Sequence, residues 1–152
     1  SYEQYLKDKG EDVTYKEYDS FADIYIEQAD AAASDAEKKE AFKKAADIYG
    51  LIAEKFDYAA IYAVSKQATA YYQINPDLKV GASLPYYSKL IELINAKDEK
   101  TASDNNKLIT AYNYLAVHYI QNDKVAEAKK YAEKLLELSP ENETGKQIMN
   151  LK

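Results

Sequence analysis

The sequence contains no cysteine, no tryptophan and no arginine, and it has only four glycines and three prolines among its 152 residues. Without Cys there are no disulfides, thiolate zinc sites or cysteine nucleophile. All 20 basic residues are Lys and the net charge is −6, so the chain lacks both the guanidinium fork and the basic surface typical of nucleic-acid binders. We therefore predict no nucleic-acid partner. The scarcity of Gly and Pro, which interrupt helices, favours long helices.

Long hydrophobic runs are also missing. No apolar stretch approaches the roughly 18 residues needed to span a bilayer, so we predict no direct membrane insertion. Residues 1–6 have the pattern of a helix interior rather than of a signal peptide, and we interpret the sequence as a piece of a longer protein. The bias toward Tyr, Lys, Asp and Asn is typical of bacterial secreted or periplasmic chains. It favours a periplasmic or cell-envelope location over a cytoplasmic one.

Apolar residues recur at alternating spacings of three and four, which is the one-face stripe of an amphipathic helix. The stripes comprise Tyr18, Phe21, Tyr25 and Ala29; Phe42, Ala45, Tyr49, Ile52 and Phe56; Ile61, Val64, Ala68 and Tyr71; Tyr87, Leu90 and Ile94; Leu108, Tyr112, Leu115 and Tyr119; and Ala128, Tyr131, Leu135 and Leu138. The pattern predicts an all-α fold of antiparallel helices joined by short loops.

Polar residues and glycines mark the expected helix ends. Two pairs have the capping-box spacing, Thr14 with Glu17 and Ser34 with Glu37. Gly10 is expected to end the first helix in the left-handed conformation. Either Ser103 or Asp104 is expected to cap the helix that carries Leu108.

The segment from Ile109 to Asn142 has a recognisable spacing. It carries Tyr112-x2-Leu115-Ala116-x2-Tyr119, followed by Ala128, Ala132 and Pro140. This arrangement resembles the tetratricopeptide repeat (TPR), a 34-residue helix–turn–helix unit. The sequence departs from the family at Ala116, where the family has Gly, at Ala132, where it has an aromatic residue, and at Asn122-Asp123, where it has a turn Gly.

Two weaker copies of the same pattern precede this segment. The resemblance implies one TPR-like domain over residues 1–152, with antiparallel hairpins stacked as a right-handed superhelix. Its parts are expected at residues 1–10 (the tail of a truncated repeat), 15–57, 59–96 and 104–142 (three repeats), and 141–151 (a C-terminal capping helix).

The resemblance also implies a function. A TPR-like protein is expected to be a protein–protein interaction scaffold without catalytic activity, binding a peptide or protein partner in a concave groove lined by the first helix of each repeat. The groove candidates are Lys16, Asp19, Asp23, Glu27, Tyr62, Ser65, Thr69, Tyr72, Gln73, Asn113, Val117, Ile120 and Gln121. The alternative interpretation is a helical support module of a bacterial envelope or carbohydrate-uptake complex.

Charge at the groove positions bears on the choice of partner. Asp19 and Asp23 stand where the family's carboxylate-binding members carry basic residues, which argues against that binding mode and favours a basic partner. The same acidic residues also fit an ordinary solvated helix face. Most of the 16 tyrosines have core-stripe spacing, and only Tyr62 and Tyr72 are stronger candidates for binding.

The sequence contains no strong pattern for a catalytic or metal-binding site. The single histidine, His118, is expected to be partly buried and hydrogen-bonded, because a lone His without a second ligand makes a poor metal site. Asn75-x-Asp77 and Asp104-Asn105-Asn106 lack the spacing of a calcium loop and are expected to form turns and caps. We therefore predict no catalytic residues, no metal and no cofactor.

Overall fold

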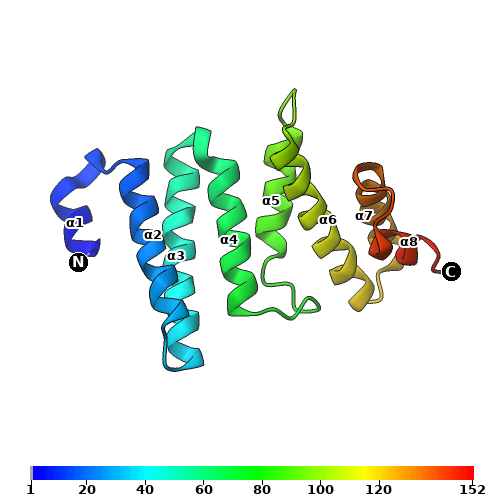
Figure 1. The fold of residues 1–152 in the computed structure, drawn as a ribbon, viewed down its shortest axis with the longest axis horizontal. Coiled ribbons are helices and arrows are strands. Elements are labelled where there is room, and N and C mark those ends of the chain that lie inside the picture. The colour runs from blue at the N-terminus through cyan, green and yellow to red at the C-terminus, as the bar shows by residue number, and fades with distance from the viewer. Residues whose placement is uncertain (1) are drawn as a thin grey trace. The chain divides into compact units, whose positions relative to one another are not determined.

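The computed structural model describes residues 2–152, and all regular secondary structure in that range is helical. The prediction of an all-α fold is confirmed. The chain forms two compact units that divide between Ile74 and Asn75 (Figure 1). The first unit contains α1 (Tyr2–Lys9), α2 (Tyr15–Asp30), α3 (Asp35–Lys55) and α4 (Ala60–Ile74). The second contains α5 (Leu84–Asn95), α6 (Ala102–Gln121), α7 (Val125–Leu138) and α8 (Glu143–Met149).

In the first unit α3 is the central helix. Both α2 and α4 pack against it, and short connections make each consecutive pair antiparallel (Figure 1). Ala22, Ala45 and Ala63 are each 0 % exposed and lie in one core cluster. Their small side chains allow the three helices to approach closely, and the larger Ile48 and Ile52 fill the remaining space. Because α2 and α4 share α3 as a neighbour, they run in the same direction.

In the second unit α6 packs against both α5 and α7, and α8 packs against α7 and α6. Ala116, Ala128 and Ala132 are fully buried where α6, α7 and α8 meet, together with Ile148. The small residues on the helix stripes thus mark the closest helix contacts in this unit as well.

The expected repeats map onto these helices in different ways. Residues 15–57 correspond to α2 and α3, and residues 104–142 correspond to α6 and α7; in each pair the two helices pack together. The helices of the 59–96 repeat, α4 and α5, belong to different units. Residues 1–10 contain α1 and residues 141–151 contain α8.

Most helix ends follow the local chemistry of the sequence. Thr14 and Glu17 form the predicted capping box at the start of α2. Ser34 caps α3, accepting a hydrogen bond from the Glu37 amide at 3.2 Å. Gly10 follows α1 with a φ of 59°, which confirms its left-handed conformation. These ends are decided by neighbouring residues, and so the sequence alone predicts them.

The predicted cap of α6 was wrong. The helix begins after Thr101, not at Ser103 or Asp104. The Thr101 hydroxyl accepts a hydrogen bond from the Asp104 amide at 3.0 Å, and the Asp104 carboxylate accepts one from the Thr101 amide at 2.9 Å. Asp104 is therefore the third helical residue of a capping box, where its negative charge also favours the helix N-terminus.

The buried carboxylate of Asp104 is expected to stabilise the protein in a pH-dependent way. Lys97 Nζ lies 2.5 Å from this carboxylate. The hydrogen bond from Lys97, and then that from Thr101, lower the pKa of Asp104 below its ordinary value of 3.8. A lowered folded-state pKa stabilises the protein above the unfolded pKa, and this stabilisation is lost as pH falls through the folded pKa. We expect Asp104→Asn to reduce the free energy of unfolding by about 1–2 kcal/mol at pH 7, and by less as the pH falls below 3.8.

Urea denaturation of wild type and variant at several pH values measures this effect. Asp98→Asn is the matched control, because Asp98 is exposed in the same α5–α6 connection. A difference between wild type and Asp104→Asn that stays constant between pH 7 and pH 3 would show that the carboxylate charge is not the cause.

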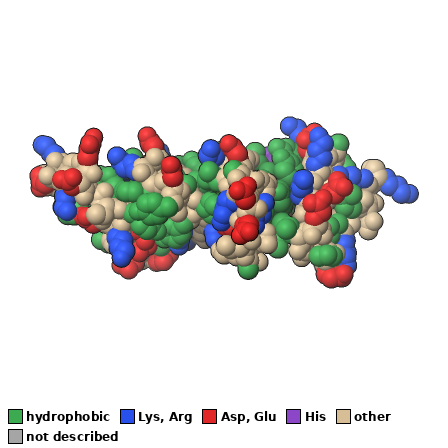
Figure 2. Space-filling view, turned by 90° about the horizontal axis from the view of Figure 1, so that it is seen from above, with side chains coloured by type: hydrophobic (Ala, Val, Ile, Leu, Met, Phe, Trp, Pro, Cys, Tyr) green, Lys and Arg blue, Asp and Glu red, His purple; other side chains and the backbone are tan. Residues whose placement is uncertain are grey.

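The surface is mixed in charge. In Figure 2 acidic and basic side chains intermingle with apolar surface across the face in view. Several exposed pairs are within ion-pair distance at helical spacing, such as Lys39 with Asp35 at 3.1 Å, and such pairs contribute little to stability. Among the described helices, none is long and apolar enough to cross a membrane.

Candidate functional site

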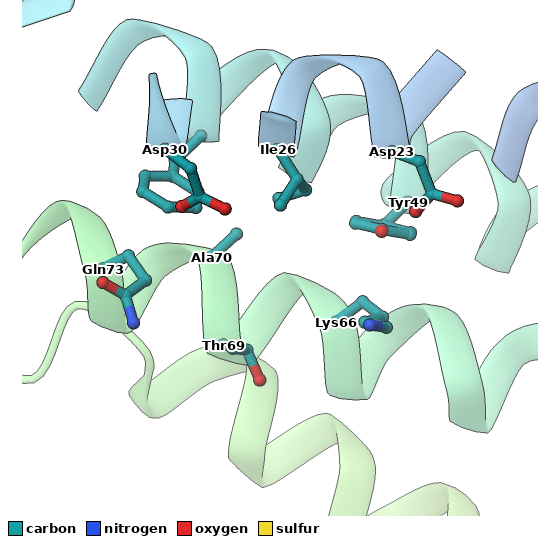
Figure 3. A pocket seen from close by; sticks show the side chains of 9 residues that line it. Asp23, Ile26, Asp30, Tyr49, Lys66, Thr69, Ala70 and Gln73 are labelled. Atoms are coloured by element: carbon teal, nitrogen blue, oxygen red, sulfur yellow. The ribbon is translucent and has the colours of Figure 1, made fainter. Parts of the chain in front are cut away.

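A hollow of about 260 Å³ lies between α2 and α4, above α3, in the first unit (Figure 3). We call it the α2–α4 slot. Its lining residues are Asp23, Ile26 and Asp30 from α2; Phe42 and Tyr49 from α3; and Lys66, Thr69, Ala70 and Gln73 from α4. The spacings of three, four and seven residues place each set on one face of its helix, so two helical turns of α2 oppose two of α4.

The floor of the slot is apolar and rigid. Phe42, Tyr49 and Ala70 are 5 %, 1 % and 2 % exposed, and their packing on the helix core fixes them. Charged and polar side chains lie on the rim. Asp23 and Asp30 contribute carboxylates from α2, and Lys66 and Gln73 contribute an ammonium group and an amide from α4 (Figure 3). An apolar floor with a few convergent polar groups is the usual composition of a ligand site.

A hydrogen bond ties the two rims together beside the slot. The Tyr62 hydroxyl of α4 donates to Asp19 Oδ1 of α2 at 2.9 Å, across 43 residues of sequence. The ring of Tyr62 lies edge-on to that of Tyr49, with centroids 6.3 Å apart, and Lys66 Nζ lies 5.7 Å from the Tyr62 centroid. Two helices that flank the hollow are thereby held at a defined separation.

The surroundings of the slot raise the pKa values of three side chains, those of Asp23, Tyr49 and Tyr62. Burial, and then the negative charge of Asp19, raise the pKa of Asp23, while Lys66 acts in the opposite direction. Burial raises the pKa of Tyr49 to about 12, with the charges of Asp23 and Asp19 contributing. Burial also raises the pKa of Tyr62, and its hydrogen bond to Asp19 adds to this effect. Both tyrosines are therefore neutral hydroxyl donors at physiological pH.

These groups can bind but are poorly suited to holding a metal. Within residues 2–152, no group of three or more His, Cys, Asp or Glu side chains is arranged to hold a metal ion. The slot instead combines two carboxylates, one ammonium group, one amide and two hydroxyls with apolar side chains. That set can accept hydrogen bonds from a cationic or polar group while burying the aliphatic part of the same molecule.

The structure brings some of the predicted groove residues together. Asp23, Thr69 and Gln73 line the slot, and Asp19 and Tyr62 form the hydrogen bond beside it. The remaining candidates of this unit lie on α2 or α4 outside the lining: Lys16, Glu27, Ser65 and Tyr72. Tyr72 is 40 % exposed.

The other candidates lie on α6 in the second unit. Asn113, Val117 and Ile120 are half-buried, and Gln121 is exposed. Ile120 packs against the Ala116 and Ala128 cluster, so it serves the core of that unit at least in part.

Six lining residues were missed by the sequence analysis, and they fall into two groups. Asp30 lies seven residues after Asp23, and Lys66 lies seven before Gln73, so helical spacing alone would have added both. Phe42 and Tyr49 had been assigned to the core stripe of α3, and Ile26 and Ala70 carry no polar signal. Their contribution to a slot depends on how α2, α3 and α4 pack, which the sequence pattern does not show.

His118 is partly buried and hydrogen-bonded, as predicted. Its Nδ1 lies 2.7 Å from the carbonyl oxygen of Leu78. One turn later Asn122, the C-cap residue of α6, donates from its side-chain amide to the Lys79 carbonyl at 3.0 Å. One turn before His118, the Tyr114 hydroxyl accepts from the Ser83 amide at 3.2 Å. Two turns of α6 and its C-cap thus hold the connection that precedes α5. Asn75-x-Asp77 forms a turn in the same connection, also as expected.

Comparison with known proteins adds no functional assignment, because no protein-family model, curated protein or solved structure matches the chain.

Proposed function

We propose that this chain is a TPR-like interaction module that binds a polypeptide partner in the α2–α4 slot and has no catalytic role. The observation that carries the proposal is the slot itself: two parallel helices, separated by a third, enclose an apolar floor and present charged groups at its rim. Helical-repeat proteins bind extended segments in such surfaces between successive helices.

Features of the second unit support the TPR part of the proposal. Ala116 and Ala128, at small-residue positions of the family pattern, are each 0 % exposed between α6 and α7. Asp123, at the turn where the family has Gly, has a φ of 61°, the conformation that Gly adopts most easily. The helix α7 ends at Leu138, just before Ser139-Pro140. The local geometry therefore suits the family pattern even where the residue types depart from it.

Thr69→Arg tests the use of the slot. Thr69 is exposed on the lining, so we expect the long cationic side chain to occupy the hollow and repel a basic segment. Peptides selected against the wild-type protein from a displayed random library would supply the probes, and isothermal titration calorimetry would measure their affinities. We expect at least about a tenfold weaker affinity for the variant, or about 1.4 kcal/mol.

Thr110→Arg is the matched control. Thr69 and Thr110 are both exposed, and each hydroxyl donates to the carbonyl four residues earlier, at 3.1 and 3.2 Å. The two variants therefore carry the same change in charge, size and helix propensity. Selected peptides that bind Thr69→Arg as tightly as the wild type would rule out the slot as the binding surface. Loss of affinity in both variants would place α6 in the binding surface too.

A further inference from the structure

The two ends of the α2–α4 slot differ in whether a basic residue faces the carboxylate. At one end Asp23 of α2 faces Lys66 of α4 across the hollow (Figure 3), and Asp19, hydrogen-bonded to Tyr62, adds a second carboxylate beside the slot. At the other end Asp30 faces Gln73, which is neutral, and the lining contains no basic residue there. Both ends therefore carry carboxylate charge, but a facing ammonium group offsets part of it only at the Asp23–Lys66 end.

Helix dipoles add to the negative charge at the Asp30–Gln73 end. Asp30 is the last residue of α2, and Gln73 is the penultimate residue of α4. Because α2 and α4 run in the same direction, both C-termini lie at this end of the slot. Each C-terminus carries a partial negative charge from its free carbonyl groups and favours a nearby cation. Asp30 thus adds a full negative charge beside two helix C-termini. The N-terminus of α3, which carries the opposite partial charge, begins at Asp35, outside the slot lining.

The floor at this end suits an organic cation. Phe42 lines the slot and packs in one cluster with Ala29 and Ile74, the sequence neighbours of Asp30 and Gln73. An aromatic face attracts an ammonium or guanidinium group within about 6 Å. The same ring already has one such neighbour in Lys38, whose Nζ lies 6.0 Å from the ring centroid and which does not line the slot. A cation bound at Asp30 would therefore have a carboxylate, an amide oxygen and a ring as neighbours.

The middle of the slot suits an aliphatic chain. Ile26 and Ala70 lie between the two charged ends, and neither offers a side-chain polar atom. Seven residues separate Asp23 from Asp30, which corresponds to a length of roughly 10 Å along the helix. The volume of about 260 Å³ lies just below the range of roughly 300–1,000 Å³ that holds drug-sized ligands, so the slot fits a single side chain.

We propose that the α2–α4 slot receives one Lys or Arg side chain of the partner polypeptide, with the cationic group at Asp30 and Gln73 and the methylene chain along Ile26 and Ala70. This inference rests on the proposed function and adds the type of partner side chain that the slot recognises. Asp30 determines the charge preference, since it is the only ionised group lining that end. The Asp23–Lys66 end, where the Lys66 ammonium group would repel a second cation, is left for the partner's main chain.

Nuclear magnetic resonance titration of the ¹⁵N-labelled protein tests the proposal with defined probes. The probes are the Nα-acetyl amides of lysine, arginine and norleucine, and the free diamine putrescine. Norleucine has the aliphatic chain of lysine without the ammonium group. We expect lysine and arginine to shift the amide signals of residues around Asp30, Phe42 and Gln73, with at least about tenfold higher affinity than norleucine.

Two variants of α2 test whether the preference for a basic side chain depends on Asp30 itself or only on the total negative charge of the helix. Asp30→Asn is expected to abolish the preference for lysine over norleucine. Glu27→Gln is the matched control: it removes the same charge from an exposed position of the same helix, outside the slot lining, and is expected to preserve the preference. Both residues are exposed, so neither change disturbs the core.

The outcomes also distinguish this inference from the proposed function. Equal affinity for lysine and norleucine, or no saturable shift with either basic probe up to its solubility limit, would overturn the assignment of a basic side chain. Tighter binding of putrescine than of the lysine amide would indicate that the slot binds a free amine. It would overturn the proposal that the bound cation belongs to a polypeptide. If library peptides still lost affinity in Thr69→Arg after either result, the proposed function would stand without this specificity.

Discussion

Replacing Gly81 by Ala is expected to lower the free energy of unfolding by about 2–3 kcal/mol. Gly81 has a φ of 74°, a left-handed conformation that costs an alanine roughly 1–2 kcal/mol. A Cβ at this position would also lie 2.7 Å from Cε1 and 2.8 Å from Nδ1 of His118. The imidazole would have to move, and its hydrogen bond to the Leu78 carbonyl would be weakened or lost.

Gly10→Ala separates backbone strain from the steric effect. Gly10 has a similar φ of 59°, but a Cβ there would meet no atom within 4 Å other than those of its chain neighbours. We expect this variant to lose only the conformational part, about 1 kcal/mol. Urea denaturation followed by far-UV circular dichroism measures both variants, with NMR signals of α5 and α6 reporting on the unit that contains Gly81.

A double-mutant cycle with His118→Ala identifies the steric partner. Removing the imidazole opens space for the new methyl group, so Gly81→Ala should cost only its conformational part in that background. The expected coupling energy between the two positions is about 1 kcal/mol or more, because they are in direct contact. Additive effects of the two substitutions would contradict the close contact between residue 81 and His118.

Local features of this fold were predictable because they depend on residues near in sequence. The capping box of Thr14 and Glu17 needs a hydroxyl and a carboxylate three residues apart, and nothing from elsewhere in the chain. The α6 cap shows the limit of the same reasoning. Thr101, Ser103 and Asp104 all have cap-forming side chains, and Lys97 contributes to the choice by pairing with Asp104 from the preceding connection.

The α2–α4 slot was predictable only in part. Helical spacing correctly placed Asp23, Thr69 and Gln73 on exposed faces, and the structure brings those three residues to one hollow. Tyr49 shows why the rest could not be predicted. It has the spacing and burial of a core residue, yet it also lines the slot, because the hollow between α2 and α4 lies above this part of α3. Such a double role depends on the separation of two helices that are 30 residues apart in sequence.

Ile52→Ala is expected to destabilise the first unit strongly. Ile52 is 0 % exposed near the C-terminal end of α3 and belongs to the core cluster that α2, α3 and α4 share. Truncating a buried Ile to Ala removes apolar burial and leaves a cavity, and the two effects together cost about 2–5 kcal/mol. We expect about 3 kcal/mol here, because the small residues Ala22, Ala45 and Ala63 around α3 hold the helices close and limit collapse into the space.

Leu51→Ala is the matched control, since it removes the same number of carbon atoms from the adjacent residue of the same helix. Leu51 is half-buried and lines a second hollow of about 310 Å³ together with Leu6 and Tyr25. Because part of its side chain already meets open space, we expect its truncation to cost about 1 kcal/mol. Urea denaturation of both variants measures the difference. Equal losses would mean that α3 is no better enclosed at Ile52 than at Leu51, and the account of α3 as the central helix of this unit would then be wrong.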